Sequence, residues 1–263
     1  MSPAYIYLQL LIFFSQLQGY NGQKASFSRT IHVKQIGHAV FEIARYNETY
    51  LITLPSLHIE GLIYGNPFVE LNKCTYISSS SGFVAKIDYS GKGWVSGKKN
   101  SFIATLYPAK NEKEILYTID GQWTDSFTIR EGSKKHGGVI ETYNGKTSKI
   151  TPLTKTPIDQ QDPLESERAW RTTKEAILKG DMDTTSTEKS KIENSQRELR
   201  RKEQAEGREW QRRYFTRLPT ADAAFETLSK PIGEKIELEK TGGVWRFDPE
   251  KYKMQSAQTP QQF

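Results

Sequence analysis

The sequence predicts a mainly β fold followed by a helical C-terminal region, and three observations carry this prediction. From Gln18 to Lys149, short β-prone runs are separated by turn signals about every 8–12 residues, which is typical of an antiparallel meander. No regular alternation of strands and helices occurs there, which argues against a doubly wound α/β fold. The first 150 residues contain 16 basic and 11 acidic side chains, whereas the remaining 113 contain 21 and 20. This dense mixed charge is typical of helices with paired surface charges.

The chain begins with an apolar run from Tyr5 to Phe14 that resembles the hydrophobic part of a secretory signal. Basic residues do not precede it, since the first lysine is Lys24, and no small-residue cleavage site follows. About ten residues are also too few to cross a bilayer, which takes roughly 20. We interpret residues 1–17 as an atypical segment, either a buried strand or the product of a misassigned gene start. A signal peptide and an anchor are the alternatives.

The β-prone runs of residues 18–150 are expected to form one sheet. Alternation of apolar and polar residues, as from Ile31 to Ile36, indicates strands with one face turned inward. The runs that we expect to be strands are TIHVKQI, AVFEIA, TYLITL, GLIYG, FVAKIDYS, GWVSG, SFIATLYPA, EILYTIDGQW, SFTIR and GVIETYNG.

Residues 151–253 are expected to form the helical region, and the Gln-rich residues 254–263 a disordered tail. In the first helical segment, which Gly180 can end, four apolar residues can share one face. They are Leu164, Trp170, Ile177 and Leu178. A second helix is expected to start at the capping-box pair Thr185 and Glu188 and to run to about Ala205, with Gly207 beyond it.

The residue types that carry enzyme chemistry do not form a known pattern. The four histidines and the single cysteine, Cys74, lack zinc-site spacing, so we expect no metal or cofactor. A lone cysteine cannot form an intramolecular disulfide, so a reducing compartment fits best. The glycine-rich stretch Gly91–Lys99 does not have the spacing of a phosphate-binding loop, because Gly97 follows Gly91 by six positions where the motif needs five. No hydrolase motif is present. We expect a hairpin at this stretch and no enzyme activity.

Aromatic residues make up 11% of the chain and are interleaved with lysines, a composition that could line an RNA-binding sheet. The RNA-recognition pattern is missing and the net charge of +6 is modest. We therefore expect these rings in a core or pocket, and no nucleic acid as a partner.

The second helix contains a charged stripe formed by Lys189, Glu193 and Arg197, which are spaced by four residues. A separate packing stripe is formed by Ile192, Leu199 and Trp210. One interpretation of the charged stripe is a ladder of surface ion pairs. The other is a site for a phosphorylated headgroup, made by two cations that a central carboxylate holds in place.

Eight segments in colinear order, from about Gln18 to Tyr252, resemble the lipid-binding domain of the oxysterol-binding protein-related family, particularly its short fungal members. They are YNGQKASF (20–27), IHVKQIGHAV (31–40), PSLHIEGLIYGNPFVEL (55–71), SGKGWVSGKKNSF (90–102), YTIDGQW (117–123), PLESERAW (163–170), QRELRRKEQAEGREWQRRYF (196–215) and VWRF (244–247). The resemblance implies an incomplete antiparallel β-barrel around a lipid tunnel. The tunnel would hold one sterol or one phosphatidylinositol 4-phosphate, which family members exchange between membranes.

The resemblance also implies site residues. Lys189, Glu193 and Arg197 match the residues that surround the phosphoinositide headgroup. Positions near the sterol hydroxyl match Asn21 and Gln35. Matches to the tunnel wall are Ile59, Leu62, Pro67 and Val69. Strand alternation places Gln35 on the face of Ile31 and Val33, whereas the apolar Ile36 favours the opposite face, so the residues alone leave the direction of Gln35 open.

The family's paired histidines, its N-terminal lid and its first strands have no match here, which predicts a truncated domain. An open barrel would expose a sheet edge and an apolar wall. We therefore expect a lipid-binding or lipid-transfer protein with impaired activity. It would be cytoplasmic and in transient contact with anionic membrane surfaces through its lysine-rich exterior. The alternative is a non-transporting interaction or membrane-surface module.

Overall fold

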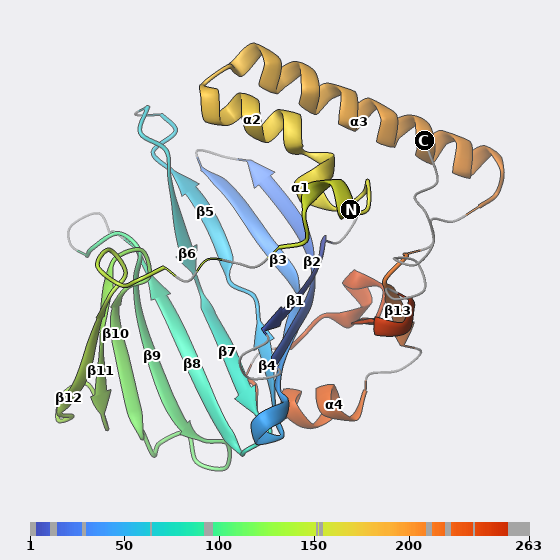
Figure 1. Cartoon of the computed structure of the whole chain (residues 1–263). Helices are drawn as coiled ribbons and strands as arrows, with labels where there is room; N and C mark the ends of the chain where they lie inside the picture. The colour runs from blue at the N-terminus through green and yellow to red at the C-terminus, as the bar shows by residue number, and fades with distance from the viewer. Residues whose placement is uncertain are drawn as a thin grey trace. The chain divides into compact units, whose positions relative to one another are not determined.

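The computed structural model contains an antiparallel sheet and a set of helices, shown in Figure 1. It describes residues 4–10, 15–27, 30–63, 65–91, 97–150, 152, 155–208, 212–218, 222–233 and 235–251. The sheet has 12 strands in the order β1-β2-β3-β4-β7-β8-β9-β10-β11-β12, and β5 and β6 extend it beside β3. Its two ends, β1 and β12, do not pair with each other in the described residues. The mainly β prediction with helices near the C-terminus is confirmed.

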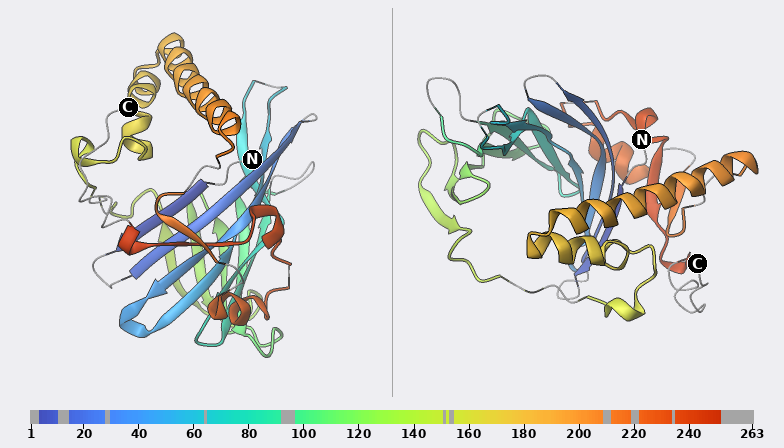
Figure 2. Two further views of the ribbon diagram at one scale, coloured as in Figure 1. Left: turned by 90° about the vertical axis from the view of Figure 1, so that its right-hand side faces the viewer. Right: turned by 90° about the horizontal axis from the view of Figure 1, so that it is seen from above.

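The sheet curves along its length, as the view from above in Figure 2 shows. Its strands are β1 (Ala4–Leu10), β2 (Ser15–Phe27), β3 (Ile31–Ile43), β4 (Glu48–Thr53), β5 (Ser56–Glu60), β6 (Phe68–Asn72), β7 (Cys74–Ser79), β8 (Phe83–Ser90), β9 (Ser101–Pro108), β10 (Tyr117–Gln122), β11 (Ser126–Glu131) and β12 (Val139–Asn144).

Several strands differ from those expected. The runs TIHVKQI and AVFEIA join into the single strand β3, and the described residues of the run GLIYG lie in the turn between β5 and β6. Strands β2, β5, β6 and β7 were not expected, because β2 is rich in glycine and amide residues and β5 to β7 are short and adjoin turn-like residues. Strand β1, which includes Tyr5–Leu10 of the apolar N-terminal run, pairs antiparallel with β2. Most of the run GWVSG and the tail 254–263 lie outside the described residues.

One face of the sheet carries the main core. Helix α4 (Ala223–Ser229) lies against β4 and β7 and contributes Phe225 and Leu228. Between strands, cross-strand pairing aligns Val40 with Leu51 and Val84 with Tyr107, and all four side chains are buried. Their burial contributes to the apolar stabilisation of this unit.

The other face is only partly covered. Residues that alternate with the core ones align across the strands and are half-buried in the described structure. They include Phe41, Ile52, Ile77, Ala85 and Leu106. An apolar face of this kind, left partly open on a curved sheet, can accept an apolar ligand.

A polar network joins the C-terminal segment to the core face. His38 is fully buried and lies between Tyr20, at 3.1 Å from Nδ1 to Oη, and Arg246, at 3.3 Å from Nε2 to Nη1. Arg246 Nε also donates to Asp222 Oδ2 at 2.6 Å. The other carboxylate oxygen of Asp222 accepts from Phe225 N at 2.7 Å and caps α4. The network therefore ties the capped helix to β2 and β3.

The chain divides into two compact units, which are described separately. One comprises Met1–Lys149 and Thr216–Phe247, and the other comprises Ile150–Phe215 and Asp248–Phe263. The change in charge density at residue 150 coincides with the first boundary. The segment Thr216–Phe247 belongs to the unit with the sheet and supplies α4, the short helical turn η4 (Leu238–Thr241) and β14 (Val244–Phe247), which pairs with β13 (Phe215–Leu218).

The second unit contains α1 (Ser166–Ala169), α2 (Arg171–Lys179) and α3 (Met182–Ala205). Gly180 ends α2 with a φ of +73°, as expected. The prediction of one apolar helical face is wrong. Trp170 separates α1 from α2, and Ile177 and Leu178 are 57% and 76% exposed. The buried side chains of α2 are instead the small Thr173 and Ala176.

Helix α3 ends at Ala205, as expected, but its start differs from the prediction. Its N-cap is Asp181, whose Oδ1 accepts from Thr184 N at 3.0 Å, and the hydroxyl of Thr185 donates to Asp181 O at 2.6 Å. Thr185 therefore lies inside the helix, and the capping-box prediction is wrong. A carboxylate at the N-cap also interacts favourably with the helix dipole, which a hydroxyl does not.

Replacing Asp181 by Ala should lower the melting temperature of the helical unit by about 2–4 °C, because the Thr184 amide loses its partner and the helix N-terminus loses a negative charge. Circular dichroism at 222 nm during a thermal scan measures this. The control is Glu188→Ala, which removes the supposed capping-box partner and should leave the transition nearly unchanged. If Glu188→Ala lowered the melting temperature more than Asp181→Ala does, the capping-box prediction would be supported after all.

Candidate functional site

The two amide side chains assigned to a sterol hydroxyl lie together on adjacent strands. Asn21 of β2 donates from Nδ2 to Gln35 Oε1 of β3 at 2.6 Å. Gln35 Nε2 in turn donates to Pro55 O at 2.8 Å. Asn21 Oδ1 is buried and has no hydrogen-bond partner in the described part of the chain. The pair therefore presents one unsatisfied acceptor, a group that costs free energy unless a donor reaches it.

Cross-strand register shows which face carries this pair. Ala39 of β3 aligns with Ile52 of β4, and strand alternation places Gln35 on the same face as Ala39. Asn21 aligns with Gly37 and so lies on that face too. The amide pair therefore belongs to the partly covered apolar face, which decides the direction of Gln35 that the residues alone left open.

The four assigned wall residues separate into two groups. Ile59 of β5 aligns with Val69 of β6 and with Ile31 of β3, so both lie on the face of the amide pair, Ile59 half-buried and Val69 40% exposed. Leu62 and Pro67 lie in the turn between β5 and β6 and are exposed. The structure thus brings two of the four onto the apolar face, and places the other two at its edge.

The charged stripe of α3 forms the expected ladder. Lys189 Nζ lies 2.7 Å from Glu193 Oε1, and Arg197 Nη2 lies 3.4 Å from Glu193 Oε2. Arg197 Nη1 also donates to Asn194 Oδ1 at 2.9 Å. The bond from Lys189, and then the charges of Lys189 and Arg197, lower the pKa of Glu193. The carboxylate therefore stays ionised and holds both cations on one side of the helix.

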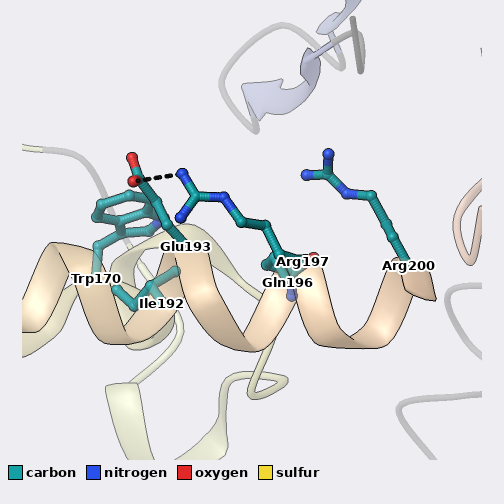
Figure 3. Close-up of a pocket in the computed structure, with 6 residues that line it drawn as sticks. All are labelled: Trp170, Ile192, Glu193, Gln196, Arg197 and Arg200. Carbon is teal, nitrogen blue, oxygen red and sulfur yellow. Dashed lines mark hydrogen bonds and ion pairs between the residues drawn. The ribbon is translucent and has the colours of Figure 1, made fainter. Parts of the chain in front are cut away.

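A hollow of about 370 Å³ lies beside this ladder, drawn in Figure 3. The Arg197 guanidinium points toward Glu193, and the Trp170 indole lies next to that carboxylate. The lining residues are Trp170, Ile192, Glu193, Gln196, Arg197 and Arg200. Sequence reasoning missed Gln196 and Arg200, although their spacing of three residues from Glu193 and Arg197 places them on the same side of α3.

The packing stripe expected on α3 is weak. Ile192 and Leu199 are half-buried, no residue of the helix is fully buried, and Trp210 lies outside the described residues. Among the described residues, no group of three or more histidine, cysteine, aspartate or glutamate side chains is placed to hold a metal ion. No described helix is both long enough and apolar enough to span a bilayer.

The sequence model of oxysterol-binding proteins matches residues 15–176, which is more than half of the chain. The chain belongs to the oxysterol-binding protein family. Protein kes1 of Schizosaccharomyces pombe is 42% identical over 237 residues, which cover 88% of this chain and 59% of that protein. The probable transporter efuK of Hormonema carpetanum is 40% identical over 237 residues, which cover 89% of this chain and 34% of that protein. The chain thus spans less than two thirds of the length of either relative.

Solved structures of the oxysterol-binding protein family have the same fold. The Osh1 ORD domain, crystallised in complex with cholesterol, matches with a TM-score of 0.64 and 17% identity, over 91% of this chain and 60% of that one. The Osh3 ORD of Saccharomyces cerevisiae, in complex with PI(4)P, matches with a TM-score of 0.60 and 18% identity, over 92% and 62%. The unclosed antiparallel sheet therefore has the fold of these ORD domains.

Proposed function

We propose that this protein binds a sterol, phosphatidylinositol 4-phosphate or both in turn, and carries them between membranes without chemical change. It would act in the cytoplasm and touch membrane surfaces transiently. The observation that carries the proposal is the Asn21–Gln35 amide pair, set in an apolar face that the described residues cover only in part. The cholesterol and PI(4)P complexes of the structural neighbours support the choice of ligands.

The chemistry of the apolar face suits a sterol. A sterol offers one hydroxyl and a rigid hydrocarbon body, so its site needs few polar groups and a long apolar wall. Asn21 Oδ1 is a buried acceptor that a hydroxyl could satisfy, either directly or through one water. Phe41, Ile52, Ile77 and Leu106 offer aliphatic and aromatic surface on the same face.

The charged ladder suits a phosphorylated headgroup. Lys189 and Arg197 supply hydrogen-bond donors with positive charge, and Arg200 adds a third cation beside the same hollow. Charge-assisted hydrogen bonds to phosphate are among the strongest polar interactions in proteins, and a guanidinium can bind two phosphate oxygens at once. Glu193 pairs with both Lys189 and Arg197 and holds them on one side of α3, where both can face one anion.

Sterol extraction from liposomes tests the proposal. Replacing both Asn21 and Gln35 by Ala should weaken sterol binding about tenfold, because the hydroxyl loses its hydrogen-bonding group. The matched control is Gln23→Ala, which removes an exposed amide two residues along β2, opposite Gln35 but outside the hydrogen-bonded pair. Thermal melting of each variant shows whether the fold is kept.

The alternative, an interaction or membrane-surface module without cargo, makes a different prediction. Native mass spectrometry of the purified protein should then show no co-purified lipid, and no variant should change sterol uptake. A co-purified sterol or phosphoinositide, lost in the Asn21 and Gln35 double variant, supports the carrier. Equal extraction by wild type and double variant contradicts the assignment of the amide pair.

A further inference from the structure

The last strand of the sheet has a free hydrogen-bonding edge. Among the described residues β12 pairs only with β11, and it lies at the lower left of the sheet in Figure 1. All six of its residues are exposed, whereas five of the six residues of β11 are half-buried. Native proteins protect such edges with lysine or proline, and β12 contains neither. The edge of β12 is therefore open to pairing with a further strand.

The side chains of β12 are apolar to an extent that is high for an exposed strand. Val139, Ile140 and Tyr143 are 58%, 55% and 42% exposed. Tyr143 stacks on Phe127 of β11, with the two ring centres 4.9 Å apart, so its ring is held in place on the sheet. A strand added beside β12 would cover these side chains and remove apolar surface from water.

The backbone of β12 shows which groups point to the free edge. Gly145 N donates to Asp125 O at 2.8 Å, where β12 ends and β11 begins. Because the direction of such bonds alternates along an antiparallel strand, Tyr143 also faces β11, and Thr142 directs its N–H and C=O away from the sheet. The register is irregular only before Glu141, so residues 141–144 form a regular stretch. Thr142 is thus a free backbone donor and acceptor in the middle of this stretch.

We propose that two copies of this chain pair through the free edges of β12, antiparallel and about a twofold axis at Thr142. The two Thr142 residues then exchange two N–H···O bonds. Thr142 Oγ1 already lies 3.3 Å from Thr128 Oγ1, and the pairing aligns the threonines of both copies in one row, a favourable cross-strand arrangement. Glu141 of each copy lies opposite Tyr143 of the other, so like charges do not meet. This pairing is independent of the lipid cargo.

The neighbouring registers are less favourable. A twofold axis at Glu141 would place two carboxylates directly opposite each other. An axis at Tyr143 would need the carbonyl of Asn144 as an acceptor, but that oxygen already accepts from Thr147 N at 3.3 Å and Ser148 N at 3.0 Å. The edge is therefore self-complementary in one register, which favours a second copy of the chain over an unrelated strand.

Pairing of β12 with itself also gives a closed assembly. The strand at the other end of the sheet, β1, would pair with β12 of a second copy only head to tail, and each added copy would leave a new free edge. That arrangement generates open-ended chains, whereas a twofold pair stops at a dimer. Six residues bury less surface than a standard interface, so the dimer should be weak and should depend on protein concentration.

Sedimentation velocity over a wide range of protein concentration tests the proposal. Wild type should pass from monomer to dimer and form no larger species. Thr142→Pro removes the outward N–H, which the fold does not use, and should weaken the dimer about tenfold or more because both central hydrogen bonds are lost. Thr142→Lys keeps the backbone donor and should also dissociate the dimer, since it places two cations at the axis.

The control is Gln9→Lys, which adds the same charge to the other end strand, β1, and should dimerise as wild type does. Thermal melting of each variant at low concentration shows whether the monomer keeps its fold. A wild type that stays monomeric at every concentration would overturn the proposal. So would larger oligomers that Gln9→Lys dissociates, because these would show head-to-tail pairing.

Disulfide trapping tests the register. Cys74→Ser removes the single cysteine, and Thr142→Cys in that background places two thiols across the axis, with Cα atoms about 5.5 Å apart, within the range for a disulfide. Mild oxidation should give a covalent dimer. Thr128→Cys is the matched control, because its two copies would lie about three strand spacings apart, roughly 14 Å. Equal cross-linking of both variants, or none in Thr142→Cys while wild type is dimeric, would overturn the axis at Thr142.

Discussion

Replacing Lys189 and Arg197 together by Ala should lower the binding of phosphatidylinositol 4-phosphate by tenfold or more and leave sterol binding unchanged. Each charge-assisted hydrogen bond to a phosphate is worth roughly 1.5–3 kcal/mol, and two such donors are removed. Extraction of labelled phosphoinositide and of labelled sterol from liposomes measures both ligands with one protein preparation.

The control for this prediction lies on the same helix. Lys191 pairs with Glu188 at 2.6 Å, is 67% exposed and lies on the opposite side of α3 from Glu193, so Lys191→Ala removes one cation without touching the ladder. It should extract both lipids as wild type does. Arg200→Ala should give an intermediate loss, because Arg200 lines the hollow without belonging to the ladder. An equal loss of phosphoinositide and sterol in the double variant would contradict the headgroup assignment.

Acidification should unfold the unit that contains the sheet, because His38 is held in its neutral form. Burial, and then the charge of Arg246, lowers the pKa of His38 to about 3. Arginine can only donate, so His38 Nε2 must accept from Arg246 and its proton lies on Nδ1, toward Tyr20. Protonation of Nε2 would place a second positive charge against the guanidinium.

The direction of the pH effect follows from the protonation of His38 in the unfolded and the folded chain. The unfolded chain takes up a proton at His38 below about pH 6.5, whereas the folded chain does not until about pH 3. The stabilisation is therefore complete above pH 6.5 and is lost as the pH falls, by about 1.4 kcal/mol for each pH unit in that window. Urea unfolding at pH 7.5, 6 and 5 measures this slope.

Two variants isolate the contribution of His38. His38→Asn cannot titrate, so the free energy of unfolding should be lower at pH 7.5 but should fall less steeply with pH. His136→Asn, which changes an exposed histidine in a loop, should keep the slope of wild type. If His38→Asn and wild type share one slope, the acid sensitivity comes from other groups and the neutral buried histidine is not its cause.

Local features of the fold and site could be predicted from the sequence. The ladder of Lys189, Glu193 and Arg197 follows from four-residue spacing in one helix, and the ion pairs form as that spacing requires. The end of α3 at Ala205 and the glycine that ends α2 are equally local. The N-cap of α3 was predicted wrongly because two local signals compete there, and the carboxylate of Asp181 takes precedence over the hydroxyl of Thr185.

Other features depend on which strands pair. The apolar face expected from Leu164 to Leu178 does not form, because helical periodicity says nothing about the partner that would cover it. Strands β5 to β7 have only five or six residues each and form through pairing with their neighbours in the sheet.

By itself the sequence determined the class of fold, the charged ladder and the family to which the chain belongs, because these depend on local spacing or on the order of short motifs. The tertiary structure decided which face is the core and which is open. Register pairs Asn21 diagonally with Gln35 and aligns both with the half-buried apolar residues. Packing of the C-terminal segment against the sheet brings Arg246 to His38 across 208 residues of sequence. Such contacts follow from hydrogen-bonded pairing and packing between distant segments, which single-chain periodicity does not encode.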